Sequence, residues 1–150
     1  MLYLILKYLH ILSAIVAIGA SSTYAVWLAQ TRMKPEALLF TLRTIIFIDR
    51  RVASSAYLLL IITGIGLGHA AAIPLLSPWL ILSYILLGLL LGLDHAFLIP
   101  LSKKSIALIE GGQHGSEAHL AIGKKMSTAG MFFMFISLAL VWLMVFKPVF

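Results

Sequence analysis

The chain has 150 residues, of which 62% are hydrophobic and only 11% are charged. This composition lies outside that of soluble globular proteins and predicts an integral membrane protein. The sequence contains no cysteine, which excludes disulfides, thiolate metal sites, iron–sulfur clusters and covalent haem attachment through C-x-x-C-H.

The net charge of +6 comes from basic residues that gather at the ends of apolar segments. At such positions Lys and Arg meet anionic headgroups, so we expect the lipid bilayer as their partner and no nucleic acid. The first apolar run, 2–28, is too long for a cleaved signal peptide and is followed by further apolar segments. We therefore expect it to be retained as a membrane helix.

Four segments reach the roughly 20 apolar residues that a membrane-spanning helix needs. We therefore predict an all-α fold in which residues 1–150 form a single transmembrane domain, a bundle of four helices. The expected spans are about 2–28, 53–73, 79–100 and 126–147.

The connecting segments differ in charge. Segments 29–52 and 101–125 carry nine Lys and Arg residues, whereas the short connection between the second and third spans carries none. By the positive-inside rule, we expect both basic segments in the cytoplasm and both termini outside a bacterial inner membrane. An apolar stretch within the first loop, 38–48, is too short to span; it either lies in the interface or extends the second helix.

His10 stands inside the first apolar run. Small residues follow it one, two and three turns along, among them Ala14, so this helix face admits close approach. Two interpretations are open. The imidazole either bonds a neighbouring helix or binds a metal or haem.

His69 lies near the outer end of the second predicted span, at the same depth as His10. Gly64, Gly66 and Gly68 precede it, and they either leave room for a flat macrocycle or let two helices touch. If the first option holds, His10 and His69 are the metal ligands, and Ala14 and Gly66 complete the cofactor site.

Asp94 and His95 lie near the cytoplasmic end of the third span. An intramembrane carboxylate is costly and marks a functional-site hypothesis, here a proton or ion-pair site. The alternative is an ion pair between Asp94 and an interfacial base, for which the candidates are Arg43, Arg50 and Lys103. Adjacent helical residues point about 100° apart, so Asp94 and His95 need not act together.

His114 and His119 fall in the polar third loop, where we expect both to be solvated. Gly111 and Gly112 break this loop, and "SEAH" predicts a helix start at Ser116.

The sequence resembles a bacterial family of predicted integral membrane proteins, domain of unknown function 2269. The resemblance is carried by "YLILKYLHILSAIVAIGA", "ITGIGL", "PLLSPWLILSYILLGLL" and "FLIPL". The four-helix layout is also similar, more distantly, to small haem-containing membrane protoporphyrinogen oxidases and copper-resistance D proteins, which place an "LH" pair early in helix 1. Only Leu9-His10 matches that feature, so neither substrate nor reaction carries over.

Three functions follow as hypotheses. The first is a haem b protein with a redox or haem-handling role, whose redox partner is a quinone or a redox protein. Two axial histidines favour electron transfer. The second is a non-catalytic accessory subunit or assembly factor that forms a homo-oligomer or joins a larger membrane complex through glycines such as Gly88 and Gly92. The third is a proton relay or transporter component that uses Asp94 and His95. Whether the chain is an enzyme is left open.

Overall fold

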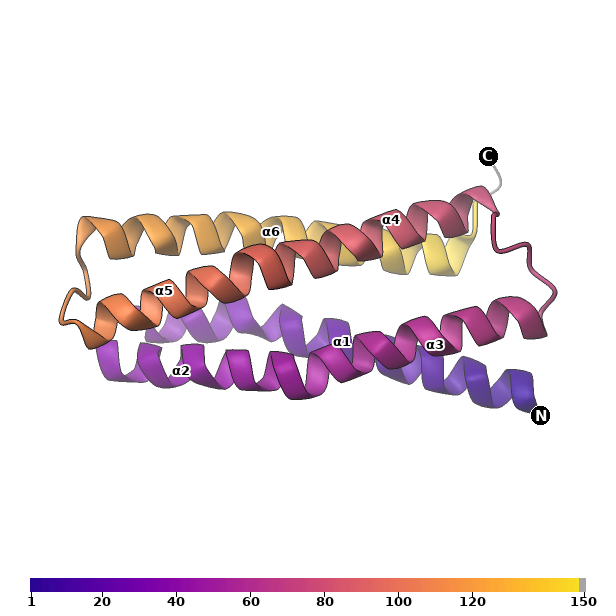
Figure 1. Ribbon diagram of the computed structural model, residues 1–150, viewed down its shortest axis with the longest axis horizontal. Helices are drawn as coiled ribbons and strands as arrows, with labels where there is room; N and C mark the ends of the chain where they lie inside the picture. The colour runs from indigo at the N-terminus through magenta and orange to yellow at the C-terminus, as the bar shows by residue number, and fades with distance from the viewer. Residues whose placement is uncertain (149–150) are drawn as a thin grey trace.

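The computed structural model describes residues 1–148, and every regular element in this range is helical (Figure 1). The predicted all-α class is confirmed. The elements in chain order are α1 (Leu2–Thr31), α2 (Pro35–Ile48), η1 (Asp49–Ala53), α3 (Ser54–Ala70), α4 (Pro78–Leu93), η2 (Asp94–Leu98), α5 (Ile99–Glu110) and α6 (Glu117–Phe146), of which η1 and η2 are short π-helical segments.

Two helical rods are longer than the sequence suggested, because consecutive helices join without a break. The elements α2, η1 and α3 form one rod, and α4, η2 and α5 form another. The segments that we expected as loops, 29–52 and 101–125, are therefore largely helical. Of the two alternatives for 38–48, the structure has the extension of the second helix. Long basic side chains do not interrupt a helix, since their heads reach water while the backbone bonds stay intact.

The turn before α6 matches the sequence prediction. Gly112 and Gly115 have φ values of +71° and +81°, a conformation that glycine adopts without steric cost. The hydroxyl of Ser116 then accepts the backbone N–H of His119 at 3.2 Å and caps the helix. The helix start predicted at Ser116 is confirmed.

Three helices are long and apolar enough to cross a membrane: Leu2–Thr31, Pro78–Glu110 and Glu117–Phe146. The helix expected as the second span, α3, has 17 residues. The start of α1, the end of α6 and the connection 71–77 all lie at one end of the molecule, and the α1–α2 and α5–α6 turns lie at the other (Figure 1).

The helices pack as two hairpins. The first pairs α1 with α2, η1 and α3, and the second pairs α6 with α4, η2 and α5. Between the hairpins, α2 packs against α5 and α1 against α6, whereas within the described residues the backbones of α3 and α4 do not approach each other closely. The two hairpins are therefore joined at the α2–α5 end and in the middle, and they separate towards the connection 71–77.

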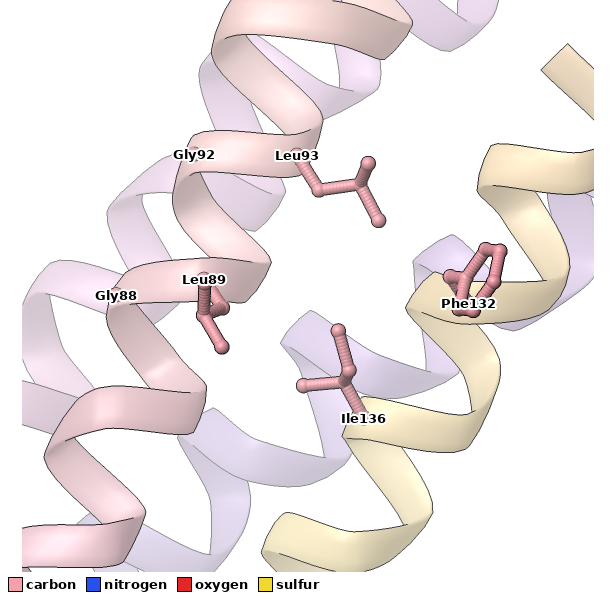
Figure 2. A pocket seen from close by; sticks show the side chains of 6 residues that line it. All are labelled: Gly88, Leu89, Gly92, Leu93, Phe132 and Ile136. Atoms are coloured by element: carbon pink, nitrogen blue, oxygen red, sulfur yellow. The ribbon is translucent and has the colours of Figure 1, made fainter. Parts of the chain in front are cut away.

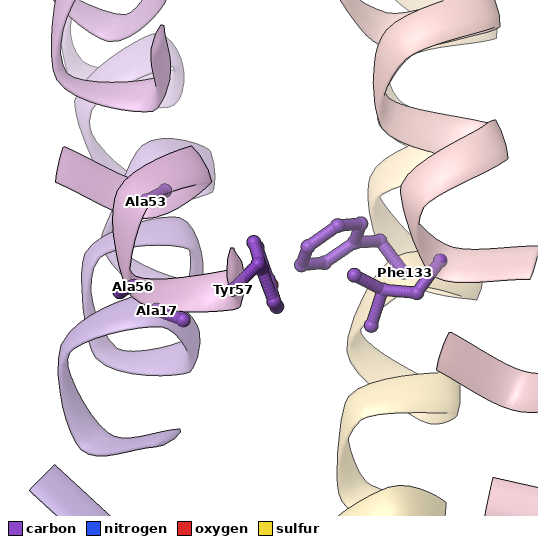
Figure 3. Close-up of a cluster of buried hydrophobic side chains, with 6 residues drawn as sticks. Ala17, Ala53, Ala56, Tyr57 and Phe133 are labelled. Atoms are coloured by element: carbon purple, nitrogen blue, oxygen red, sulfur yellow. The ribbon is translucent and has the colours of Figure 1, made fainter. Parts of the chain in front are cut away.

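A central apolar cluster holds the hairpins together (Figure 3). Tyr57 of α3 faces Phe133 of α6. Leu90 of α4 is fully buried and belongs to the same cluster. Ala17 and Ala53 are fully buried on the first hairpin, and their small side chains let α1 approach its partner closely. The polar residues described next lie beside this cluster.

Candidate functional site

Each of the two long rods changes from α-helix to π-helix at an aspartate. Asp49 is the first residue of η1, and Asp94 is the first residue of η2. A π-helical turn inserts extra backbone into an α-helix and occurs frequently at functional sites. The two hairpins thus contribute one aspartate each from the same kind of local structure.

The two aspartates meet in the interior of the bundle. Asp49 is 4% exposed and Asp94 is 8% exposed, so both carboxyl groups are buried. One ligand atom from each of Asp49, Asp94 and His95 lies within 4.8 Å of the other two. Two carboxyl groups bond only when a proton or another cation lies between them, because an ionised carboxylate only accepts.

His95 belongs to this group although it follows Asp94 directly. Its Nδ1 atom lies 3.1 Å from Oδ2 of Asp94. The expected divergence of adjacent residues therefore does not separate the two side chains here, within the π-helical turn.

Within the described residues, none of the basic partners predicted for Asp94 forms an ion pair with it. Arg43 forms an ion pair with Glu110 at the surface. Arg50 is close enough to Asp49 for an electrostatic interaction but makes no ion pair with it. Within residues 1–148, no Lys or Arg forms an ion pair with Asp49 or Asp94, so the predicted pairing with Arg43, Arg50 or Lys103 is wrong.

Two tyrosines, which the sequence did not single out, complete the group. The hydroxyls of Tyr24 on α1 and Tyr57 on α3 are buried without a hydrogen-bond partner, and so is Oδ2 of Asp49. Both tyrosines are close enough to interact electrostatically with both carboxyl groups. Ser21 lies near the Tyr57 hydroxyl and donates its own proton to the Ala17 carbonyl at 3.0 Å. Its oxygen could still accept a proton, but no hydrogen bond joins it to Tyr57. The cluster of Asp49, Asp94, His95, Tyr24 and Tyr57, named here the aspartate cluster, thus contains three buried polar atoms without partners.

Comparison with known proteins shows the family. The model of a family described as predicted integral membrane protein (DUF2269) matches residues 4–148. The chain belongs to the DUF2269 family. No curated protein and no solved structure matches this DUF2269 chain. Membership confirms the predicted membrane protein, and the more distant similarity to haem oxidases and copper-resistance proteins stays a prediction.

His10 of this DUF2269 protein bonds the neighbouring helix. Its Nδ1–H donates to the carbonyl oxygen of Leu60 at 3.0 Å and lies 3.1 Å from Oγ1 of Thr63. The ring packs on α3 so closely that a Cβ at Gly64 would lie 3.1 Å from Cε1 of His10. The first of the two interpretations of His10, a bond between helices, accounts for this geometry.

His69 does not meet His10. It lies six residues beyond Thr63, which is about 9 Å along a helix, and its side chain is exposed. Gly66, also predicted to line a cofactor site, contacts Leu6 instead, since a Cβ there would lie 3.3 Å from the Leu6 side chain. Ala14 is half-buried on α1. Because α1 and α3 touch at His10, the arrangement does not fit a haem shared by His10 and His69 between these helices.

The histidines of the third loop differ from each other. His119 is buried in the first turn of α6, where its Nδ1 accepts the Gly115 N–H at 3.4 Å. The expectation that it is solvated is wrong, because the helix begins before it. His114 remains in the turn and donates from Nε2 to the Arg32 carbonyl at 3.1 Å.

A shallow apolar groove runs between α4 and α6 (Figure 2). It is lined by Gly88, Leu89, Gly92, Leu93, Phe132 and Ile136. A Cβ added at Gly88 or Gly92 would have no atom within 4 Å. No helix in the described part of the chain therefore packs on these glycines, and their predicted contact with another copy or a partner stays a prediction.

Proposed function

We propose that this membrane protein binds a cation at Asp49 and Asp94 and acts as an ion-handling component of the membrane. One observation carries the proposal: two buried carboxyl groups from different hairpins meet without an ion pair to any Lys or Arg within residues 1–148. The predicted third hypothesis, a relay or transporter component that uses Asp94 and His95, is extended here by Asp49.

The physical reason is the cost of buried charge. Removing an ion from water costs several kcal/mol even after relaxation, and two like charges side by side add repulsion. Ionisable groups inside membranes face the bundle interior and pair with other groups, and they mark ion or proton pathways. A bound cation lowers this cost for both aspartates at once, which explains why the two rods bring them together.

The position of the cluster suits exchange with one side of the membrane. Arg50 and Arg51 follow Asp49 directly, and such charges are typical of the cytoplasmic membrane surface. The side chain of His95 is 52% exposed and that of Asp94 is 12% exposed, so His95 lies at the edge of the cluster, on the surface of the bundle. We expect the cation to enter past His95, from the membrane surface that Arg50 and Arg51 mark.

The proposal is tested by thermal unfolding of the purified full chain in detergent. The cations compared are H⁺, Na⁺, K⁺, Mg²⁺, Ca²⁺, Mn²⁺ and Zn²⁺. A cation that binds only the folded state at 100 times its Kd adds about 2.7 kcal/mol of stability, which corresponds to a rise in Tm of at least about 5 °C. We expect one or more cations to have this effect on the wild type and none on the double variant Asp49→Asn/Asp94→Asn.

The matched control is Glu36→Gln, which neutralises an exposed carboxylate at the start of α2. It should respond to cations as the wild type does. The proposal fails if no cation in the panel raises the Tm, or if the double variant responds as strongly as the control.

A haem held by His10 and His69 stays a prediction, and the same preparation tests it. A reduced b-type absorption band that disappears in His10→Ala and in His69→Ala would support haem binding. The cation site has more structural support, because His10 and His69 do not meet whereas Asp49, Asp94 and His95 do.

A further inference from the structure

We infer that the cation is a divalent transition metal ion, such as Mn²⁺ or Zn²⁺, and that Asp49, Asp94 and His95 are its protein ligands. This inference rests on the proposed function and names the class of ion. Three independent features of the aspartate cluster support it: the spacing of the ligand atoms, the unpartnered polar atoms around them, and the chemistry of the ligand set.

The spacing is close to that of a metal site. The three ligand atoms lie within 4.8 Å of one another. Ligands about 2.1 Å from a shared ion lie at most about 4.2 Å apart. A shift of about half an ångström therefore brings all three to bonding distance. For this shift, Nδ1 of His95 has to release the Leu91 carbonyl, from which it lies 3.3 Å.

The buried atoms without partners point to a bound group. Buried polar side-chain atoms normally have a hydrogen-bond partner, and each exception calls for a missing ligand, ion or water. Tyr57 is only 5% exposed, yet its hydroxyl has no partner, and neither does Oδ2 of Asp49. With an ion in place, Oδ2 of Asp49 gains a bond, and a tyrosine hydroxyl has a ligating carboxylate or a metal-bound water to donate to.

The ligand set selects the kind of ion. Mg²⁺ and Ca²⁺ prefer sites made wholly of oxygen ligands, whereas imidazole suits transition metals such as Zn²⁺, Fe²⁺ and Mn²⁺ that also accept carboxylates. Thiolate, the ligand that favours Cu⁺ and iron–sulfur clusters, is absent from this cysteine-free chain. Two carboxylates and one imidazole also give a site whose charges nearly balance those of a divalent ion.

The experiment measures Mn²⁺ binding to the full-length protein in detergent after chelator treatment. Free Mn²⁺ is followed by its electron paramagnetic resonance signal, and Zn²⁺ is then added as a competitor. We expect one Mn²⁺ per chain, displaced by Zn²⁺. We expect the affinity to fall at least about tenfold in Asp49→Asn and in Asp94→Asn, and also in His95→Gln.

His95→Gln keeps the test valid if an aspartate variant fails to fold, because His95 is exposed and lies outside the apolar core. Glu36→Gln should bind Mn²⁺ as the wild type does. The inference is overturned if neither ion binds, or if His95→Gln and the aspartate variants bind with unchanged affinity. If Na⁺ or protons alone stabilise the wild type and not Asp49→Asn/Asp94→Asn, the transition-metal inference fails while the proposed function stands; if no cation stabilises it, both fail.

Discussion

The protein carries two polar sites inside its apolar helices, and they differ in how well their hydrogen bonds are satisfied. His10 packs between α1 and α3, and its Nδ1–H bonds the Leu60 carbonyl at 3.0 Å. The aspartate cluster lies between the two hairpins, and three of its buried polar atoms have no partner. A histidine at a helix interface thus looks isolated in the sequence but is satisfied in the fold, while the aspartates are not.

This difference separates a structural role from a functional one. A satisfied polar group in a membrane joins helices and adds a modest amount of stability. An unsatisfied one lowers stability, and it persists where something else binds it. The variants below should therefore change stability in opposite directions at the two sites, and only those in the aspartate cluster should change cation binding.

The largest effect is expected for Asp49→Asn/Asp94→Asn in cation-free protein. Replacing buried charged groups by neutral groups of similar size removes desolvation cost and repulsion, so the free energy of unfolding should rise by about 1–4 kcal/mol. Unfolding in mixed micelles with increasing SDS measures it. A loss of stability in the cation-free double variant would contradict the view that the aspartates are held there at a cost.

His10→Ala should have the opposite sign. It removes the bond to Leu60 and leaves a space against α3, so we expect a loss of about 1–2 kcal/mol in unfolding free energy. Cation affinity should stay unchanged, since His10 contacts α3 at Leu60 and Thr63, which lie 11 and 14 residues beyond Asp49. The SDS titration and the Mn²⁺ titration, run on the same preparation, check both parts. A change in Mn²⁺ affinity would link the two sites.

Gly64→Ala tests the tightness of the same contact. The added methyl group would lie 3.1 Å from Cε1 of His10, so overpacking should cost about 1 kcal/mol. In the background of His10→Ala the clash disappears, and the two losses should not add. A double-mutant cycle in SDS measures the coupling, and additive losses would mean that the ring and Gly64 do not touch.

Tyr57→Phe is expected to leave stability nearly unchanged. The hydroxyl has no partner to lose in the cation-free protein, so the unfolding free energy should change by less than about 1 kcal/mol or rise slightly. Mn²⁺ affinity should fall severalfold, because the hydroxyl can no longer donate to a ligand. Equal affinities in wild type and variant would remove Tyr57 from the site.

The smallest effect is expected for Arg43→Ala. Its ion pair with Glu110 lies at the exposed end of the bundle, where such pairs contribute about 0.2–1 kcal/mol. The SDS midpoint should move little, and less still at high salt. A loss above about 2 kcal/mol would show that α2 and α5 depend on this pair more than surface electrostatics allows.

Most of the helices could be predicted from hydropathy, but the length of the two continuous rods could not. Apolar runs identified α1 and α6, and Ser116 correctly marked the start of the last helix. The sequence 38–48 left two alternatives, because an apolar stretch that ends in Asp49, Arg50 and Arg51 fits an interfacial segment as well as a continuing helix. Contact of its Leu38 and Leu42 with Ile109 of α5 settles the choice, and that contact is long-range.

Only part of the candidate site could be predicted from the sequence. Asp94 was visible because it stands alone in an apolar run, whereas Asp49 is followed by two arginines and resembles an ordinary membrane boundary. A signal was present: "IDRR" and "LDHA" both place an aspartate after an apolar residue and before a basic one or a histidine. Tyr24 and Tyr57 gave no signal, since tyrosine is common at membrane interfaces and in cores, and only the packing of the hairpins brings them to the carboxyl groups.

The π-helical turns also determine how the two hairpins face each other. Each residue of an α-helix advances the side chains by about 100° around the axis. A turn that holds one extra residue therefore rotates the whole of α2 relative to α3, and of α5 relative to α4, by roughly that angle. Loss of a single codon within 49–53 or 94–98 would remove this rotation, turn the α2 or α5 face away from its partner and part the hairpins where they now join, although every remaining side chain would be unchanged.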